Sequence, residues 1–244
     1  MNFTNISAYK FVTLAQEALV LLQQQLHERA SQLTIKGSIL LSTEGINLFM
    51  AGPTATMQEW IKHLQSYPYF SDLEFKESLS AHLPYKRLRV RIKKEIICMN
   101  QPQIQPERKT GAHLEPKDLK AWQEQHPDFV VLDTRNDYEY EVGSFEKAIQ
   151  LNIQNFNDFP AALAQLPESY KKKPILTFCT GGIRCEKATA YMLEQGFESV
   201  WQLKGGILNY FQHCGGEQFQ GNCFVFDERQ AVNPNLEEVG IHGI

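Results

Sequence analysis

The sequence predicts a chain of two α/β domains. Its 244 residues are 43% hydrophobic and 21% charged, which is enough apolar material for two modest cores. Strand-like and helical patterns alternate on both sides of a polar segment, NQPQIQPERK, that suits neither element. We therefore expect a first domain over 1–99, a linker over 100–110, a second domain over 111–213, and a tail over 214–244 that packs on the second domain.

The first domain shows strands and helices in a definite order. Apolar spacing predicts, in sequence, a strand at 6–14, a helix at 15–31, strands at 33–41 and 46–51, a helix at 53–66, and strands at 73–78 and 85–98. The two middle strands flank a turn at Thr43-Glu44-Gly45, and Pro53 lies in the first turn of a helix, where its missing N–H costs little. The first six of these elements, in the order β-α-β-β-α-β, predict a ferredoxin-like domain.

The last predicted strand of this domain alternates basic and aliphatic residues. The basic ones are Arg87, Arg89, Arg91 and Lys93, and the aliphatic ones are Leu88, Val90 and Ile92. A strand places the two sets on opposite faces. The basic stripe, as we call these four residues, is open to two interpretations: a solvated sheet face that keeps the domain soluble, or a surface that contacts RNA phosphates.

The second domain alternates strands with helices. The pattern predicts, in order, a helix at 115–125, a strand at 129–132, a helix at 159–166, a strand at 175–178, a helix from 183, a strand at 199–203 and a helix at 207–213. This order predicts a mostly parallel sheet, whose sites lie at the carboxyl ends of the strands. Asp133 and Cys179 both fall at such ends.

Cys179 is the candidate nucleophile. It lies where a strand passes into a helix, so unpaired amides of the loop and the positive end of the helix dipole favour its thiolate. The expected loop comprises Thr180, Gly181, Gly182, Ile183 and Arg184. A buried structural thiol is the alternative, which the Gly-Gly loop makes less favourable. The five cysteines form no C-x-x-C pair and the histidines show no ligand spacing, so we expect no metal.

Several neighbours are expected to support this loop. Asp133 and Arg135 should bond locally, to the backbone or to each other. The Arg184 guanidinium should lie near the mouth of the loop and attract an anion, the alternative being a surface cation. Cys185 either resolves an oxidised Cys179 or packs against the sheet, and we favour packing.

Four further polar residues have open roles. Glu186 and Lys187 either form an ion pair that orders the loop or are ordinary exposed helix residues, and Lys187 is also a candidate RNA phosphate contact. Glu44 and Asn47 either touch the second domain or RNA, or serve the turn at Gly45 through local hydrogen bonds.

Charge and hydropathy exclude several classes of protein. The net charge of −4 argues against a chain that binds polyanions over its whole surface. No apolar run of about 18 residues exists, and the N-terminus has no basic flank followed by an apolar signal core. We expect a cytoplasmic protein with no membrane contact.

The motifs resemble known families. Asp133-Thr134-Arg135, the Cys179 loop and Leu203-Lys204-Gly205-Gly206 resemble a rhodanese-like domain over 111–213. In that family the active cysteine carries a sulfane sulfur, and the four residues between Cys179 and Arg184, one fewer than in cysteine phosphatases, suit a persulfide. The blocks CTGGIRCEKA, DTRNDYEYEVGSF, EGIN, KRLRVRIKKEI and CFVFDER (223–229) together resemble the tRNA uridine hydroxylase family.

This resemblance implies an oxidoreductase that converts the wobble uridine, U34, to 5-hydroxyuridine with Cys179. It implies molecular oxygen as co-substrate, and the sequence identifies no other cofactor. The expected partner is tRNA, through its anticodon loop and the basic stripe, with no stable protein partner. Two alternatives stay open: a persulfide-carrying sulfurtransferase that uses thiosulfate-type donors, and a non-catalytic RNA-binding or scaffold protein.

Overall fold

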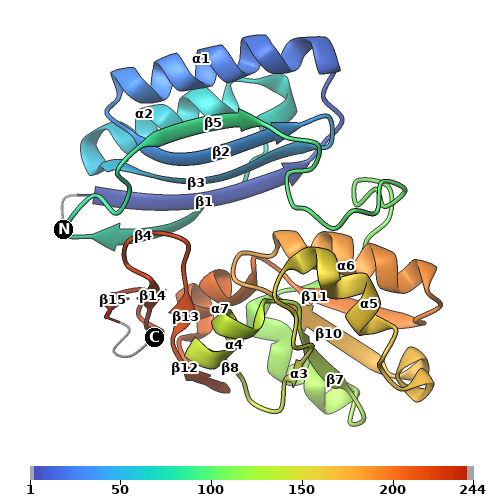
Figure 1. Ribbon diagram of the computed structural model, residues 1–244. Helices are drawn as coiled ribbons and strands as arrows, with labels where there is room; N and C mark the ends of the chain where they lie inside the picture. Colours follow the sequence, from blue (N-terminus) through green and yellow to red (C-terminus); the bar gives the residue numbers. More distant parts are fainter. Residues whose placement is uncertain (1–2, 241–244) are drawn as a thin grey trace. The chain divides into compact units, whose positions relative to one another are not determined.

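The computed structural model describes residues 3–240 and divides into two compact units, one ending at Ile97 and the other starting at Cys98 (Figure 1). Each unit has its own sheet and its own apolar core. No residue from 93 to 111 belongs to a helix or strand. Within the described residues, no helix combines the length and the apolarity needed to cross a bilayer.

The first unit contains a five-stranded sheet in the order β4-β1-β3-β2-β5. Its strands are β1 (Phe3–Phe11), β2 (Lys36–Ser42), β3 (Gly45–Pro53), β4 (Lys76–Ser80) and β5 (Leu88–Ile92). The first four are antiparallel neighbours and complete the predicted β-α-β-β-α-β arrangement. β5 is added at the edge, parallel to β2. The strand predicted over 85–98 is therefore wrong in length, because the chain leaves the sheet after Ile92.

Two helices, α1 (Leu19–Gln32) and α2 (Thr54–Gln65), cover one face of this sheet (Figure 1). Short 3₁₀ turns precede α1 at Gln16–Ala18 and follow α2 at Pro68–Phe70. Buried Leu26 and Trp60 from the helices share a core with Ile39 and Leu48 from the strands. Burial of such side chains on one face is the main stabilising contribution to this unit.

The turn at Gly45 depends on glycine. Gly45 has φ +135°, and a Cβ there would lie 2.0 Å from the carbonyl oxygen of Lys10. The Glu44 carboxylate accepts a hydrogen bond from the Ile96 amide at 2.6 Å, and Asn47 donates to the Ile96 carbonyl at 3.0 Å. Both polar side chains therefore hold the segment that follows β5, which explains why that segment turns away from the strand.

The second unit is built on a parallel sheet in the order β6-β11-β10-β7-β9. Its strands are β6 (Ala112–Leu114), β7 (Val130–Asp133), β9 (Ile149–Gln150), β10 (Pro174–Phe178) and β11 (Ser199–Leu203). Side chains of α3 (Leu119–Gln125) and α7 (Gly206–Cys214) pack with Leu176 and Phe178 on one face. α6 (Ile183–Glu194) lies on the other face, where Gln202 of β11 donates to Glu186 at 3.0 Å.

Short elements complete this unit, and the sequence patterns did not predict most of them because they span few residues. They are α4 (Asp137–Val142), β8 (Gly143–Phe145), α5 (Phe159–Leu163), β12 (Phe219–Gly221), β13 (Cys223–Phe224), β14 (Ala231–Val232) and β15 (Glu238–Val239), with 3₁₀ turns at Pro116–Asp118, Phe156–Asp158 and Glu168–Lys172. β12 pairs with β8, and β13, β14 and β15 form a small antiparallel sheet. The segment after α7 thus pairs with the rest of the second unit through β8.

Candidate functional site

Cys179 lies directly after β10 and four residues before the start of α6. Its side chain is fully buried, and the Gly182 amide donates a hydrogen bond to its sulfur at 3.1 Å. Gly182 has φ +98°, a backbone conformation that glycine adopts without strain and that turns this amide towards the sulfur. The strand-to-helix loop is therefore a cradle for a negatively charged sulfur.

The start of α7 anchors the carbonyl groups of this loop. The carbonyl oxygen of Cys179 accepts from the Ile207 amide at 2.9 Å, and that of Thr180 accepts from the Leu208 amide at 3.1 Å. Gly206 has φ +66°, and a Cβ there would lie 2.3 Å from the Cys179 oxygen. The Gly205-Gly206 pair thus lets a second helix approach closely enough to fix the loop.

The charges around Cys179 favour its thiolate. Burial alone would raise the pKa of Cys179, but the Cys185 thiol, the Arg184 guanidinium and the backbone amides of α6 outweigh it and lower the pKa to about 5. Burial and the hydrogen bond to Cys179 raise the pKa of Cys185 well above its usual value. The pair therefore holds one proton, on Cys185, with the negative charge on Cys179.

Arg184 forms a buried ion pair with Glu139 of α4. The two guanidinium nitrogens donate to the carboxylate at 2.5 and 2.7 Å, and Thr180 donates to the same carboxylate at 3.1 Å. Arg184 is therefore not a surface cation, and its charge is already paired. Burial would raise the pKa of Glu139, and Arg184 more than offsets this and lowers it.

Glu139 is a site residue that the sequence analysis missed. Its only local signal is the spacing Asn136-x-x-Glu139, a capping-box pattern that opens α4. Asn136 donates its backbone amide to Glu139 at 3.2 Å, so one carboxylate both caps a helix and binds the Arg184 guanidinium.

Asp133 and Arg135 form a second buried ion pair at the end of β7. Arg135 Nη2 donates to Asp133 at 2.7 Å and to the Gly143 carbonyl at 2.6 Å, and Ser144 donates to Asp133 at 2.8 Å. Within the described residues, Arg135 Nη1 is buried without a hydrogen-bond partner, whereas its Nε and Nη2 both donate within the protein. The pair joins the end of β7 to β8.

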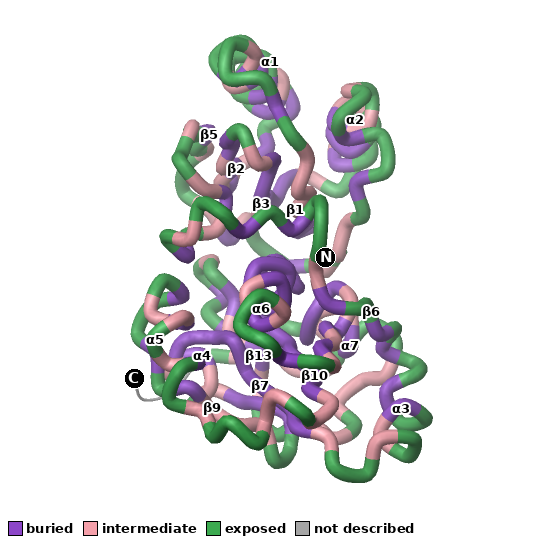
Figure 2. Tube along the Cα trace, turned by 90° about the vertical axis from the view of Figure 1, so that its right-hand side faces the viewer, coloured by how far each residue is buried: buried purple, intermediate pink, exposed green. Residues whose placement is uncertain are grey.

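Glu186 and Lys187 are buried, with exposed fractions of 8% and 1%, so the expectation of ordinary exposed helix residues is wrong for both. They belong to α6, most of which is buried (Figure 2). Glu186 accepts from His113 at 2.9 Å and from Gln202, which ties α6 to β6 and β11. The hydrogen bond with Glu186 raises the pKa of His113. The structure gives Glu186 a role in packing the first turns of α6.

The basic stripe lies in the first unit, on and beside β5. Arg87, Arg89, Arg91 and Lys93 are all exposed. Val90, between them, is buried in the core, and Leu88 and Ile92 pack against it. The alternation thus separates four positive charges from the core along one edge strand.

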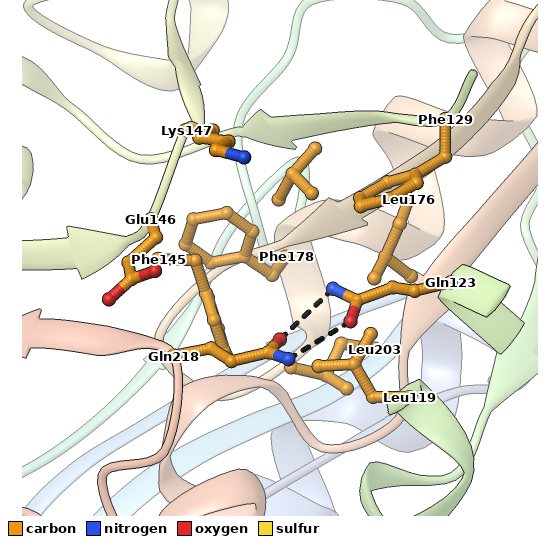
Figure 3. A pocket seen from close by; sticks show the side chains of 11 residues that line it. Leu119, Gln123, Phe129, Phe145, Glu146, Lys147, Leu176, Phe178, Leu203 and Gln218 are labelled. Atoms are coloured by element: carbon orange, nitrogen blue, oxygen red, sulfur yellow. Dashed lines mark hydrogen bonds between the residues drawn. The ribbon is translucent and has the colours of Figure 1, made fainter. Parts of the chain in front are cut away.

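A cavity lies on the α3 face of the parallel sheet and encloses about 650 Å³, part of it open to solvent (Figure 3). Phe129, Leu176 and Phe178 form apolar walls, and the side-chain amides of Gln123 and Gln218 exchange two hydrogen bonds of 3.0 and 3.1 Å across one side. Cys179 does not line this cavity.

The other cysteines lie outside the loop. Cys98 is exposed, Cys214 is half-buried and Cys223 is buried, and within residues 3–240 none of the five cysteines forms a disulfide. Burial raises the pKa of Cys223 to about 12. Across residues 3–240, no three His, Cys, Asp or Glu side chains come close enough together to hold a metal ion.

Comparison with known proteins extends this picture to nearly the whole chain. Residues 3–96 match the model of the UPF0176 acylphosphatase like domain, and residues 115–213 match that of the rhodanese-like domain. A tRNA uridine(34) hydroxylase of Cupriavidus metallidurans is 48% identical over 98% of this chain and 86% of its own. Proteins of the same name from Thiobacillus denitrificans and Bordetella avium are 48% and 46% identical over 98% of this chain, and over 98% and 100% of theirs. These identities extend through both units, so the chain belongs to the tRNA uridine(34) hydroxylase family.

Proposed function

We propose that this protein hydroxylates C5 of uridine 34 in tRNA and that Cys179 is the reacting side chain. The observation that carries the proposal is similarity over nearly the full length to proteins named for that reaction. The relatives from Cupriavidus metallidurans and Thiobacillus denitrificans are each 48% identical to this chain. The buried cysteine loop agrees with it, because a sulfur with a pKa of about 5 is a thiolate at neutral pH.

A thiolate can act on uridine as a nucleophile. Addition of the Cys179 sulfur to C6 of the ring places electron density on C5, which is the position to be hydroxylated. With O2 as co-substrate, one oxygen atom forms the C5–OH group and the other leaves as water. The C5 proton is then lost and the thiolate leaves C6. An external two-electron reductant supplies the electrons that reduce the second oxygen atom of O2 to water.

The substrate base must leave its stack to reach a buried sulfur. The anticodon loop is single-stranded, so unstacking one of its bases costs only a few kcal/mol. We assign the basic stripe to the phosphates of the tRNA, because Arg89 and Arg91 present exposed charges from a rigid strand. A tRNA substrate places the reaction in the cytoplasm.

Nucleoside mass spectrometry tests the reaction. Unmodified tRNA, the purified protein, isotopically labelled O2 and a reductant should yield 5-hydroxyuridine that carries one labelled oxygen. Cys179→Ser should abolish the product. The matched control Cys98→Ser, which removes an exposed thiol from the segment between β5 and β6, should retain full yield. Product formed by Cys179→Ser would refute the role of this sulfur.

Salt-dependent binding tests the basic stripe. The double variant Arg89→Ser/Arg91→Ser removes two charges and should reduce the slope of log K against log salt by about 1.4, at about 0.7 per phosphate of a single strand. Lys62→Ser, on an exposed position of α2, is the control and should leave the slope unchanged. An unchanged slope in the double variant would place the tRNA elsewhere.

A sulfurtransferase is the second candidate function. The cradle around Cys179 favours it, because the Gly182 amide that contacts the sulfur could equally hold the outer sulfur of a persulfide. Thiosulfate should then add one sulfur atom to the mass of the protein, and cyanide should remove it as thiocyanate. Rapid turnover of this kind, without any 5-hydroxyuridine, would favour the sulfurtransferase over the hydroxylase.

A further inference from the structure

Phe226 is an exposed aromatic ring that the structure holds beside the Cys179 loop. We propose that this ring is the platform on which the uracil of the target nucleotide stacks while Cys179 acts on it. The inference rests on the proposed function and adds to it a residue that positions the substrate.

The loop between β13 and β14 fixes the backbone of Phe226. The Val225 amide donates to the Gln230 carbonyl at 2.8 Å and closes this loop. Inside it, Arg229 donates from Nε and Nη2 to the Asp227 carboxylate at 2.9 and 2.7 Å, and both charged side chains are nearly buried. A backbone hydrogen bond and a two-point ion pair restrain the backbone of this loop, from which Phe226 projects.

Phe226 is exposed, whereas the residue before it in the chain is buried. Its exposed fraction is 46%, whereas that of its neighbour Val225 is 5%. A large apolar side chain exposed on a well-ordered loop loses the stabilisation that burial would give it. Single exposed apolar side chains are common on protein surfaces, so the contacts of this ring with Arg184 and Phe224 are what point to a binding role.

Other aromatic rings support Phe226 from one side. Its ring packs edge-to-face on Phe224, with centroids 5.2 Å apart, and Phe224 packs in the same way on Tyr138. The Tyr138 hydroxyl accepts a hydrogen bond from Asn136 at 3.0 Å. These contacts restrict the ring of Phe226 and leave part of its surface accessible.

Arg184 links this ring to the nucleophile. The guanidinium carbon of Arg184 lies 5.9 Å from the centroid of Phe226, and Nη2 of the same side chain lies 3.4 Å from the hydroxyl of Thr180, the residue after Cys179. Because Glu139 already neutralises Arg184, this guanidinium is poorly suited to grip a phosphate. Its place beside an aromatic ring suits a planar, uncharged group such as uracil.

Stacking on an aromatic side chain would meet the need of the reaction. The target base must be held still next to the sulfur, and stacking is tolerant of base identity, so Phe226 positions the base and does not select it. Removal of one base–aromatic stack typically weakens binding by about 5- to 150-fold. We expect Phe226→Ala to raise KM for tRNA within that range, and Phe226→Tyr to restore it.

The test combines kinetics with a binding signal that does not need catalysis. Phe226→Trp should gain fluorescence that an anticodon stem–loop with U34 quenches, while a stem–loop that is abasic at position 34 leaves it unquenched. Leu79→Ala, which removes a side chain that is 48% exposed in the first unit, is the matched control and should behave as wild type. The ultraviolet absorbance of the Cys179 thiolate should be the same in every variant.

The outcomes separate the two proposals. If the wild-type protein makes no 5-hydroxyuridine, the proposed function fails. If the wild type is active but Phe226→Ala has an unchanged KM, or the abasic stem–loop quenches the Trp as strongly as the one with U34, the platform is refuted. Loss of the thiolate signal in Phe226→Ala would show that the ring acts through the loop and would also overturn the platform.

Discussion

Replacement of Cys185 by alanine tests what makes Cys179 a thiolate. At a pKa of about 5, about 99% of Cys179 is ionised at pH 7, against about 3% of an ordinary cysteine at 8.5. The Cys185 thiol is the strongest of the groups that lower this pKa. A hydrogen bond to a charged group stabilises it by about 1.5–3 kcal/mol, and a thiol is a weak donor, so the lower value applies. At about 1.36 kcal/mol per pKa unit, its loss should raise the pKa of Cys179 by about one unit.

Ultraviolet absorbance of the thiolate as a function of pH measures this shift without any need for a reagent to reach the buried sulfur. The wild type should show a transition at about pH 5 that Cys179→Ala lacks. In Cys185→Ala the transition should move to about pH 6, and in the control Cys214→Ala it should stay in place. An unmoved transition in Cys185→Ala would mean that the loop amides and Arg184 hold the thiolate alone. A wild-type transition near 8.5 would refute the thiolate itself.

Three further substitutions test the packing of the site. Glu139→Gln removes the buried negative charge that neutralises the Arg184 guanidinium. It should lower the free energy of unfolding, measured in urea, by about 3–5 kcal/mol. The exposed control Glu141→Gln should change this free energy by less than about 0.5 kcal/mol. Gly206→Ala brings a Cβ against the backbone of the cysteine loop and should lower the free energy of unfolding by at least about 1–3 kcal/mol. Gly181→Ala is the control and should fold normally, because a Cβ there meets no atom within 4 Å. Equal stability of the two variants would contradict the close approach of Gly206 to the loop. The folded state raises the pKa of His113, so the ion pair of His113 with Glu186 stabilises the protein below the unfolded pKa of the imidazole. This stabilisation is lost as the pH rises through the folded pKa, and the melting temperature of the wild type should fall over that range. The same fall in His113→Gln would assign the effect to another group.

The amino-acid sequence was sufficient to predict what depends on local spacing. Alternating residues around Val90 predicted a strand with a basic face, and those residues are exposed on one side and packed on the other. The order of strands and helices predicted a ferredoxin-like domain followed by a parallel sheet, and both were confirmed. The apolar strand that ends at Cys179, followed by two glycines, predicted a cysteine at the start of a helix. Each of these inferences used residues that are neighbours in the chain.

Only the tertiary structure decided which distant groups surround that cysteine. The partner of Arg184 is Glu139, 45 residues earlier, and the helix that fixes the carbonyl of Cys179 starts at Gly206. Glu44 and Asn47 bind a segment about fifty residues later in the chain, which is why β5 is short. A parallel sheet brings the ends of strands together whatever their separation in sequence, so local spacing carries no record of these pairs. The sequence alone indicates that Cys179 lies between a strand and a helix. The folded loop brings the Cys185 thiol, the Arg184 guanidinium and the amides of α6 to its sulfur, and these groups make it a thiolate.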